Sequence, residues 1–335
     1  MKIIFFDHTD PDQRTYVQER LKDHVVEFIE KPVQDVLVEE LPDMDIAAIF
    51  VGSKFTGELF LNAPQLKYIT TRSTGFDHID LQKAAEKNVL VSNVPFYGSN
   101  TVAEHAIALL LALTRKIPES VHRVKDGSFT YQGLQGVDLM ERTLGIVGGG
   151  HIGLHVAQIA KGFGMKTFVY DLHQDEQLAQ EYGFTYESDL DKLLGMSDVI
   201  SLHLPLNEHT QHIINQESIQ KIKEGAYLIN TARGGLVETD ALVQALNSGK
   251  LAGVGLDVLE GEEFLQDELS FLAEEHTEDE VKSVLEDHVL IEMDNVIVTP
   301  HNAFNTKEAH FRNLETTVNN ILSFIDGNPQ NIVKI

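Results

Sequence analysis

The sequence predicts an α/β protein built from two doubly wound parallel sheets, and three observations support this. In the middle of the chain, short apolar runs alternate with amphipathic segments of helical length, as in parallel strands joined by crossover helices. The first hundred residues repeat this pattern more loosely. A glycine-rich segment, Gly148–Gly153, lies between one apolar run and a helix-like segment. The length of 335 residues is enough for two domains, each with its own core.

The composition is that of an ordinary globular protein, with 42% hydrophobic and 23% charged residues. The absence of cysteine excludes disulfides, thiolate metal sites and a cysteine nucleophile, and it fits a reducing compartment. The start of the chain lacks the long apolar stretch of a signal peptide. The longest apolar run, Ala106–Leu113, is far shorter than the roughly 20 residues that span a bilayer. We therefore expect a cytoplasmic protein with no membrane partner.

The formal net charge of −26 argues against nucleic acid as a partner, because a phosphate backbone requires clustered Lys and Arg. We interpret the acidity as a well-solvated surface, and composition leaves open whether it reflects a salt-rich habitat. An anionic substrate remains compatible with this charge, since a single buried arginine can reverse the local potential.

The predicted elements of the larger part begin with a strand before the glycine-rich segment and a helix after it, at Ile152–Phe163. A second helix is expected at Asp240–Leu246, capped by Thr239 and ended near Gly249. Six strands with helices between them suit a doubly wound domain. The predicted strands are Leu144–Val147, Thr167–Tyr170, Val199–Leu202, Tyr227–Ile229, Val254–Leu256 and Val296–Val298.

The first hundred residues predict a smaller α/β domain without a glycine-rich loop. Its expected strands are Ile3–Phe6, Ala47–Val51, Tyr68–Thr70 and Val89–Val91, with helices such as Pro11–Lys22 between them. The run Thr101–Lys116 predicts a helix that is apolar nearly all round, so we expect it to be buried between domains or subunits. Gly98-Ser99-Asn100 before it is interpreted as a hinge and cap.

The last strand is followed by one long predicted helix from about Lys307 to Ile325. Because this helix lies beyond the larger domain, we expect it to return to the first domain. The predicted domains are therefore 1–99 with 299–335, which is discontinuous, and 100–298. The acidic segment Phe264–Leu290 has no glycine or proline, and we interpret it as an inserted helical excursion with a solvated face.

The glycine-rich segment has the spacing of a dinucleotide-binding loop. Gly148 permits a tight turn, Gly150 allows the backbone to approach a pyrophosphate, and Gly153 allows the helix to pack closely on the sheet. The pyrophosphate would lie at the positive N-terminus of that helix. Asp171 directly follows the next strand, where a carboxylate accepts the ribose hydroxyls and repels a 2′-phosphate. The pattern predicts NAD rather than NADP.

Ligands of an open α/β sheet bind beyond the carboxyl ends of its strands, so the residues at those ends are candidates for chemistry. Arg233 is the best cation for a carboxylate, since its planar fork binds both oxygens, and Gly234-Gly235 leave room beside it. His301 is the best proton donor for reduction of a 2-keto acid. His203, at another strand end, has apolar neighbours and is interpreted as lining the cofactor, while His105 and His151 have packing explanations. Spacing does not choose among the acidic residues after the fifth strand, Glu260, Glu262 and Glu263, as the partner of His301.

Six motifs resemble the D-isomer-specific 2-hydroxyacid dehydrogenases, and they occur in that family's order over nearly the whole chain. They are Thr70–Asp80 (TTRSTGFDHID), Val94–Glu104, Leu144–Gly153, Ile229–Val237 (INTARGGLV), Gly255–Glu262 (GLDVLEGE) and Val298–Phe304 (VTPHNAF). The resemblance implies a Rossmann NAD-binding domain inserted into a smaller, flavodoxin-like substrate domain. It also implies a homodimer formed through the helix near 101–116, and no metal.

The resemblance implies a role for each matching residue. Arg233 binds and polarises the substrate, His301 is the acid/base, and Glu262 is its acidic partner. Substrate contacts are implied for Thr74, Gly75, Tyr97, Arg233 and His301. Contacts with NAD are implied for Gly148, Gly150, His151, Ile152, Gly153, Asp171, Leu204, Pro205, Thr210, Thr231, Ala232, Arg233 and Asp257.

Within this family the chain looks most like the D-lactate dehydrogenases, which often have a glutamate-rich stretch before the histidine and a Thr-Pro-His-x-Ala-Phe ending. Glu263 stands where glycerate-type relatives usually have proline. Gly52 stands where D-lactate enzymes tend to have an aromatic residue, so we expect a pocket for pyruvate or a slightly larger 2-keto acid. The alternatives are a hydroxypyruvate or glyoxylate reductase and an NADH-sensing binding protein on the same fold.

Overall fold

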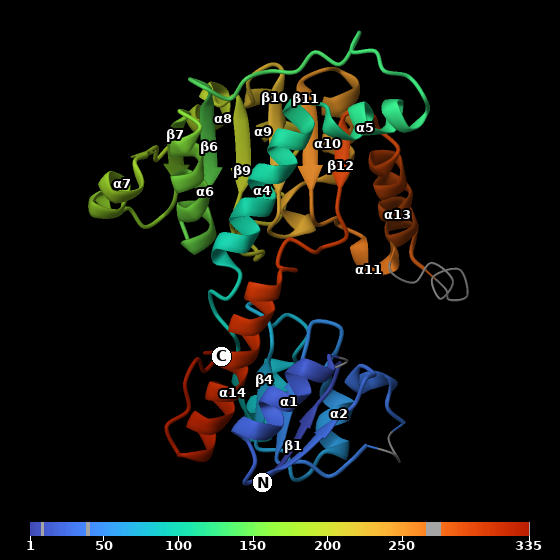
Figure 1. Cartoon of the computed structure of the whole chain (residues 1–335), viewed down its shortest axis with the longest axis vertical. Helices are drawn as coiled ribbons and strands as arrows, with labels where there is room; N and C mark the ends of the chain where they lie inside the picture. Colours follow the sequence, from blue (N-terminus) through green and yellow to red (C-terminus); the bar gives the residue numbers. More distant parts are fainter. Residues whose placement is uncertain (8–9, 38–40, 266–275, 335) are drawn as a thin grey trace. The chain divides into compact units, whose positions relative to one another are not determined.

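The computed structural model describes residues 1–7, 10–37, 41–265 and 276–334. The chain divides into two compact units (Figure 1). Unit 1 consists of Met1–Tyr97 and Asn305–Ile335, and unit 2 of Gly98–Phe304. The larger unit is therefore inserted into the smaller one.

Unit 1 is built on a five-stranded sheet in the order β2-β1-β3-β4-β5. All of its neighbouring strands are parallel, and this order is that of flavodoxin-like folds. The three central strands are almost fully buried because both of their faces are covered. The strands are β1 (Lys2–Phe5), β2 (Val25–Phe28), β3 (Ile46–Ile49), β4 (Tyr68–Thr71) and β5 (Leu90–Ser92).

Helices cover both faces of this sheet. On one face, α14 contacts β4 and α1, and its apolar residues enclose Tyr68 in a common core. On the other face, α2 and α3 pack together over a second core that contains Phe55 and Phe60. The helices of unit 1 are α1 (Pro11–Arg20), α2 (Gly57–Asn62), α3 (Leu81–Glu86), α14 (Lys307–Ile325) and the short 3₁₀ turn η1 (Val33–Asp35).

Unit 2 is built on a seven-stranded parallel sheet in the order β12-β11-β10-β9-β6-β7-β8. The chain starts at β6, winds outward to β8, and then returns to the other side of β6 at β9, which is the Rossmann arrangement. The strands are β6 (Thr143–Val147), β7 (Lys166–Tyr170), β8 (Thr185–Tyr186), β9 (Val199–Leu202), β10 (Ala226–Asn230), β11 (Leu251–Leu256) and β12 (Val296–Val298).

Two groups of helices cover the two faces of this sheet. Figure 1 shows α4 lying across one face, where it packs on α6 and on β10, β11 and β12. On the other face, α8, α9, α10 and α13 follow one another over the larger core. The helices are α4 (Ser99–Thr114), α5 (Ile117–Lys125), α6 (His151–Gly162), α7 (Glu176–Tyr182), α8 (Leu190–Met196), α9 (Gln216–Lys221), α10 (Thr239–Asn247), α11 (Glu262–Leu265), α13 (Glu278–Ile291) and the 3₁₀ turn η3 (Gly234–Leu236).

The predicted fold is confirmed, with four local differences. The edge strands β2 and β8 were not expected, because Glu27 interrupts the apolar residues of β2 and β8 has only two residues. Thr239 is the first residue of α10 rather than its cap, which is Glu238. The helix expected from Thr101 begins at Ser99, so Gly98 is its cap. That helix is a core element of unit 2, because it covers the sheet of its own unit.

The acidic segment expected as a helical excursion overlaps the end of α11 and most of α13, and its residues 266–275 lie outside the described part of the chain. The second boundary between the units falls after Phe304, whereas we expected it at residue 299. The six residues 299–304 belong to unit 2 because the side chain of Asp257 forms hydrogen bonds with three of them.

Candidate active site

The glycine-rich loop between β6 and α6 is packed so tightly that two of its glycines have no room for a side chain. Gly148 has a φ of +107°, and a Cβ built on it would lie 2.5 Å from the carbonyl oxygen of His203. A Cβ on Gly153 would lie 2.1 Å from the carbonyl oxygen of Gly148. These contacts fix the turn and bring the start of α6 close to the sheet.

Gly150 has a different reason to be glycine. A Cβ there would meet no protein atom within 4 Å, so packing alone does not exclude a side chain. Gly150 is also the N-cap of α6, and no side chain caps this helix. The helix begins with His151 and Ile152, and an anion placed in the open space at Gly150 would lie at its positive N-terminal end. This open space at the helix end fits the pyrophosphate of a dinucleotide.

Asp171 follows β7 and is held against the glycine-rich loop. Its Oδ2 accepts the backbone N–H of Gly149 at 2.7 Å, and its Oδ1 accepts that of His173 at 2.8 Å. Each carboxylate oxygen has further acceptor capacity, which suits the two hydroxyls of a ribose. A negative charge here disfavours a 2′-phosphate, so the residues of this loop fit NAD.

Arg233 lies in the loop after β10, and the buried Asn230 shapes that loop. The Asn230 side chain accepts the Ala232 N–H at 3.0 Å and donates to the Arg233 carbonyl at 2.8 Å. A Cβ on Gly234 would lie 2.0 Å from the carbonyl oxygen of Leu259, so this loop packs directly on the loop after β11. Arg233 Nη1 donates to the Ala232 carbonyl at 2.7 Å. The guanidinium is thereby placed at the carboxyl edge of the sheet.

Glu262 and His301 form a hydrogen-bonded pair in unit 2. His301 Nδ1 lies 2.7 Å from Glu262 Oε1, and Glu262 Oε2 accepts the Leu259 N–H at 3.1 Å. The hydrogen bond to Glu262 raises the pKa of His301, and the charges of Glu262 and Asp257 act in the same direction. Burial and the positive charge of Arg233 oppose this rise in the pKa. A histidine in this setting holds a proton near neutral pH and presents Nε2 for transfer.

Asp257 fixes the loop that carries His301. It is 1% exposed and follows β11. Its carboxylate accepts the N–H groups of Asn302 at 3.0 Å and Ala303 at 2.8 Å, and the hydroxyl of Thr299 at 2.5 Å. His301 itself has a φ of +48°, a left-handed conformation that a non-glycine residue adopts only where its surroundings hold it. We expected Asp257 beside NAD, and the structure shows its oxygens engaged with this loop.

The other residues expected around NAD follow β9 and β10. Thr210 donates its hydroxyl to the Pro205 carbonyl at 2.6 Å, which closes the turn after Leu204. Thr231 is 8% exposed, and its hydroxyl has no hydrogen-bond partner among the described residues. His203 Nε2 lies 2.8 Å from Ser201 Oγ, and burial lowers the pKa of His203 to about 3. His203 is therefore neutral, which agrees with a lining role and not with proton donation.

The three remaining candidates belong to unit 1 and are described within it. Thr74 and Gly75 follow β4, and Tyr97 follows β5, so all three lie beyond the carboxyl ends of strands. The Thr74 hydroxyl donates to the Val94 carbonyl at 3.1 Å. The Gly75 carbonyl accepts the Ser73 hydroxyl at 2.6 Å, and the Tyr97 carbonyl accepts Arg312 Nε at 2.8 Å. Their side chains and carbonyls thus stabilise the loops at this edge.

Sequence reasoning missed residues that position the candidates. Asn230 and Thr299 shape the loops of Arg233 and His301, and each is a polar residue at the end of an apolar strand. A polar residue at the end of an apolar strand is a feature that could have identified both from the sequence. His105, which we explained by packing, has Nε2 within 3.0 Å of the Thr299 hydroxyl and 3.5 Å of Asp257. It therefore belongs to the same network.

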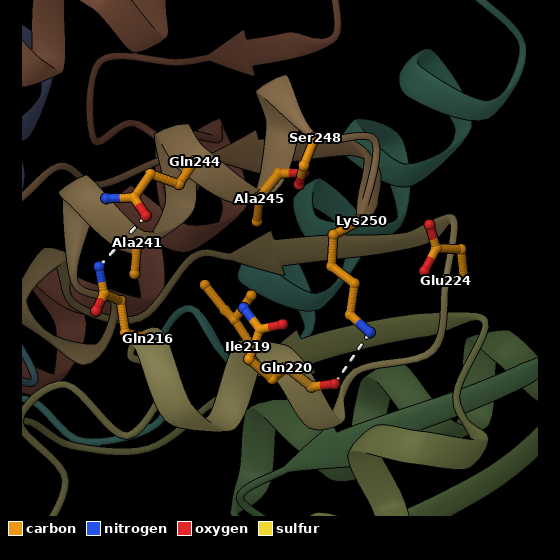
Figure 2. Close-up of a pocket in the computed structure, with 9 residues that line it drawn as sticks. All are labelled: Gln216, Ile219, Gln220, Glu224, Ala241, Gln244, Ala245, Ser248 and Lys250. Atoms are coloured by element: carbon orange, nitrogen blue, oxygen red, sulfur yellow. Dashed lines mark hydrogen bonds between the residues drawn. The ribbon is translucent and has the colours of Figure 1, made fainter.

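A surface pocket of about 430 Å³ lies between α9 and α10, on the face of unit 2 that these two helices cover (Figure 2). Lys250 Nζ donates to the Gln220 carbonyl across it at 3.0 Å, and none of the candidate residues lines it. Among the described residues there is no cluster of side chains that could hold a metal ion. The helices in the described part of the chain include none that is long and apolar enough to cross a membrane.

Comparisons with known proteins identify relatives of this chain. The NAD-binding domain of the D-isomer specific 2-hydroxyacid dehydrogenases matches residues 107–303. An aromatic 2-oxoacid reductase of Clostridium sporogenes is 40% identical, covering 77% of this chain and 76% of its own, and a hydroxypyruvate reductase of Thermotoga maritima is 39% identical, covering 85% of both chains. Among solved structures, D-lactate dehydrogenase from Aquifex aeolicus, complexed with NAD and lactic acid, has a TM-score of 0.87 at 40% identity, covering 99% of this chain and 98% of its own. The chain therefore belongs to the D-isomer-specific 2-hydroxyacid dehydrogenases, and its cofactor is NAD.

Proposed function

We propose that this protein reversibly reduces a small 2-keto acid, pyruvate or a slightly larger analogue, to the D-2-hydroxy acid with NADH. The observation that carries the proposal is the 2.7 Å hydrogen bond between Glu262 and His301, which supplies a protonated imidazole near neutral pH. Arg233 supplies a fixed cation at the same edge of the sheet. Its loop follows β10, and one strand, β9, separates β10 from β6, which leads into the glycine-rich loop.

Each catalytic side chain has one task in this proposal. The Arg233 guanidinium binds the carboxylate of the keto acid and polarises its carbonyl. Bound NADH supplies the hydride for the carbonyl carbon. His301 Nε2 donates the proton to the developing alkoxide, and Glu262 stabilises the imidazolium before transfer and orients the ring. Thr74, Gly75 and Tyr97 are proposed as further substrate contacts from unit 1.

The size of the substrate is less constrained by these residues than the type of reaction. Gly52 leaves space where D-lactate enzymes tend to have an aromatic side chain, and a Cβ there would lie 3.6 Å from Asp7 Oδ1, an ordinary contact. Relatives of nearly equal identity include enzymes named for hydroxypyruvate and for aromatic 2-oxoacids. We propose D-lactate dehydrogenase activity as the main one, with 2-keto acids somewhat larger than pyruvate also accepted.

A panel of 2-keto acids tests this proposal directly. The measurement is kcat/KM for pyruvate, 2-ketobutyrate, 2-ketoisocaproate, phenylpyruvate, hydroxypyruvate and glyoxylate, each with NADH and NADPH. We expect NADH to be preferred and pyruvate or a slightly larger aliphatic acid to be best. A clear preference for hydroxypyruvate or glyoxylate would instead make it a reductase of those acids. Tight NADH binding without turnover of any acid would favour an NADH-sensing binding protein.

We also propose that the protein acts in the cytoplasm as a homodimer formed through the region of the helix near 101–116. The support is an exposed apolar surface directly after that helix: Ile117, Val121 and Val124 are each about half exposed on α5. Phe129 and Tyr131 beyond it are 93% and 81% exposed. Exposed apolar patches of this kind mark interaction sites. Light scattering at micromolar concentration tests it, and a monomeric mass would exclude it.

A further inference from the structure

Asp287 is an acidic side chain of α13 that is fully buried, with an exposed fraction of 0%. Its Oδ2 accepts the backbone N–H of Gly261 at 3.0 Å. Its Oδ1 is also buried, and it has no hydrogen-bond partner among the described residues. A carboxyl group in such a place destabilises the fold unless it satisfies a group that has no other partner, and here that group is the amide of Gly261.

The Gly261 amide matters because Gly261 directly precedes Glu262 in the chain. A Cβ on Gly261 would lie 2.9 Å from both Asp287 Oδ2 and Ser283 Oγ. The turn from Leu259 to Glu262 is therefore seated on α13 without space for a side chain. The same turn is closed by the Leu259 N–H, which donates to Glu262 Oε2 at 3.1 Å. The hydrogen bond from Gly261 to Asp287 and the hydrogen bond from Leu259 to Glu262 thus belong to one turn.

The charges around Asp287 favour its neutral form. Glu260 and Glu262 face it from the turn, and Glu286 faces it from its own helix. Burial, followed by these carboxylates, raises the pKa of Asp287 to about 7. The cation on this helix, Lys282, lies beside Glu286 and Asp240 of α10. The strand β12, which also packs on α13, contributes only apolar residues.

We propose that Asp287 is a positioning residue for the Glu262–His301 pair: by accepting the Gly261 N–H, it holds the Glu262 carboxylate on His301 Nδ1. The helix α13 is then part of the active-site framework. The proposal rests on the proposed role of the pair as proton donor, but its geometry can be tested without turnover.

The test compares three variants with the natural protein by NMR titration of the histidine side chains, with His301 assigned from His301→Gln. In Asp287→Leu the Gly261 N–H loses its acceptor and Glu262 leaves His301, so the pKa of His301 falls toward the ordinary value of about 6.5. In Asp287→Asn the amide oxygen still accepts the Gly261 N–H, so the pKa of His301 stays raised. Glu292→Gln, which removes an exposed carboxylate at the end of the same helix, is the matched control and leaves the titration unchanged.

The same variants give a second readout if a keto acid is turned over. Asp287→Leu lowers kcat by about 10²-fold, while NADH binding and the rate of Asp287→Asn remain close to normal. Thermal unfolding verifies that each variant is folded. If Asp287→Leu does not fold, Gly261→Ala moves the turn while keeping Asp287, and it is expected to lower the pKa of His301 in the same way.

An unchanged His301 titration in a folded Asp287→Leu or Gly261→Ala protein overturns the proposal. The proposal is also overturned if the pKa of His301 falls as far in Asp287→Asn as in Asp287→Leu. Both outcomes can be observed in the protein without substrate, and they are therefore distinct from a failure of the proposed reaction.

Discussion

Glu262 and His301 are joined by a 2.7 Å hydrogen bond from Oε1 to Nδ1, although they are 39 residues apart in the chain. Glu262 begins the short helix after β11, and His301 stands in the loop after β12. Because β11 and β12 are neighbours in a parallel sheet, their carboxyl ends meet at one edge.

The pH dependence of both reaction directions follows from this pair. Reduction requires protonated His301, whose pKa is raised mainly by the hydrogen bond to Glu262. The rate of keto-acid reduction should therefore be constant at low pH and fall only as pH rises through this raised value. Oxidation of the hydroxy acid requires neutral His301 and should rise over the same range. The measurement is kcat/KM against pH in both directions, with Glu262→Gln expected to move both transitions to lower pH.

Replacing the proton donor should reduce turnover without affecting cofactor binding. In His301→Gln we expect kcat for keto-acid reduction to fall by about 10²–10⁴-fold, because glutamine cannot donate a proton to the alkoxide. The NADH dissociation constant, measured by fluorescence titration, should remain the same. His122→Gln changes an exposed histidine of α5 and serves as the control. A rate of His301→Gln equal to that of the control would exclude the assignment.

The preference for NADH should depend on the carboxylate of Asp171. In Asp171→Ser the ribose loses a charged hydrogen-bond acceptor, which is worth about 1.5–3 kcal/mol, so NADH affinity should fall by about 10–100-fold. NADPH should gain relative to NADH, since the negative charge that repels a 2′-phosphate is removed. The measurement is the ratio of kcat/KM for the two cofactors. Glu176→Ser, an exposed acidic residue nearby in the chain, should leave this ratio unchanged.

The width of the substrate pocket is expected to depend on Gly52. In Gly52→Phe a large side chain occupies the position where D-lactate enzymes tend to have an aromatic residue, so larger 2-keto acids should lose kcat/KM by at least about 10-fold relative to pyruvate. The control variant is Val51→Phe, which places the same ring at the exposed neighbouring position. Equal losses for pyruvate and 2-ketoisocaproate would show that Gly52 does not set substrate size.

Asp287 should make the protein less stable as pH rises. Its pKa is 3.8 in the unfolded chain and is raised to about 7 by burial in the fold. The unfolded state therefore releases this proton first, and stability falls between these two values and levels off above about pH 7. Asp287→Asn cannot ionise, so it removes this pH-dependent fall in stability. Its free energy of unfolding should exceed that of the natural protein only slightly at pH 4, and by an amount in the kcal/mol range at pH 8. Urea unfolding at both pH values measures it, and an equal gain at both would contradict the assignment.

The fold was largely predictable because its signals are local. The long helix α14 has the range Lys307–Ile325 that the pattern predicts, since one amphipathic run starts after a capping threonine. The central strands are apolar runs of the expected length. The edge strands β2 and β8 carry a weaker signal, because Glu27 interrupts the apolar residues of β2 and β8 has only two residues.

The candidate site was predictable where it follows from strand ends and not where it depends on distant packing. Asp171 directly follows an apolar run, and Arg233 and His301 follow theirs within four residues, so strand ends together with side-chain chemistry identify all three. Glu262 required the family resemblance, because three acidic residues stand within reach by spacing. Asp287 gave no signal, since an aspartate in an acidic helical segment suggests a solvated face, yet its side chain is completely buried. Only the packing of α13 against the turn reveals it.

The chain passes from one unit to the other after Phe304, three residues beyond His301. Arg233, Asp257, Glu262 and His301 are consequently carried by a single unit, together with the glycine-rich loop. Substitutions in unit 1, such as those at Gly52, leave the alignment of the proton donor with its carboxylate untouched. On the proposed roles of Gly52 and His301, substrate range and acid–base chemistry can therefore diverge independently, the first through unit 1 and the second through unit 2.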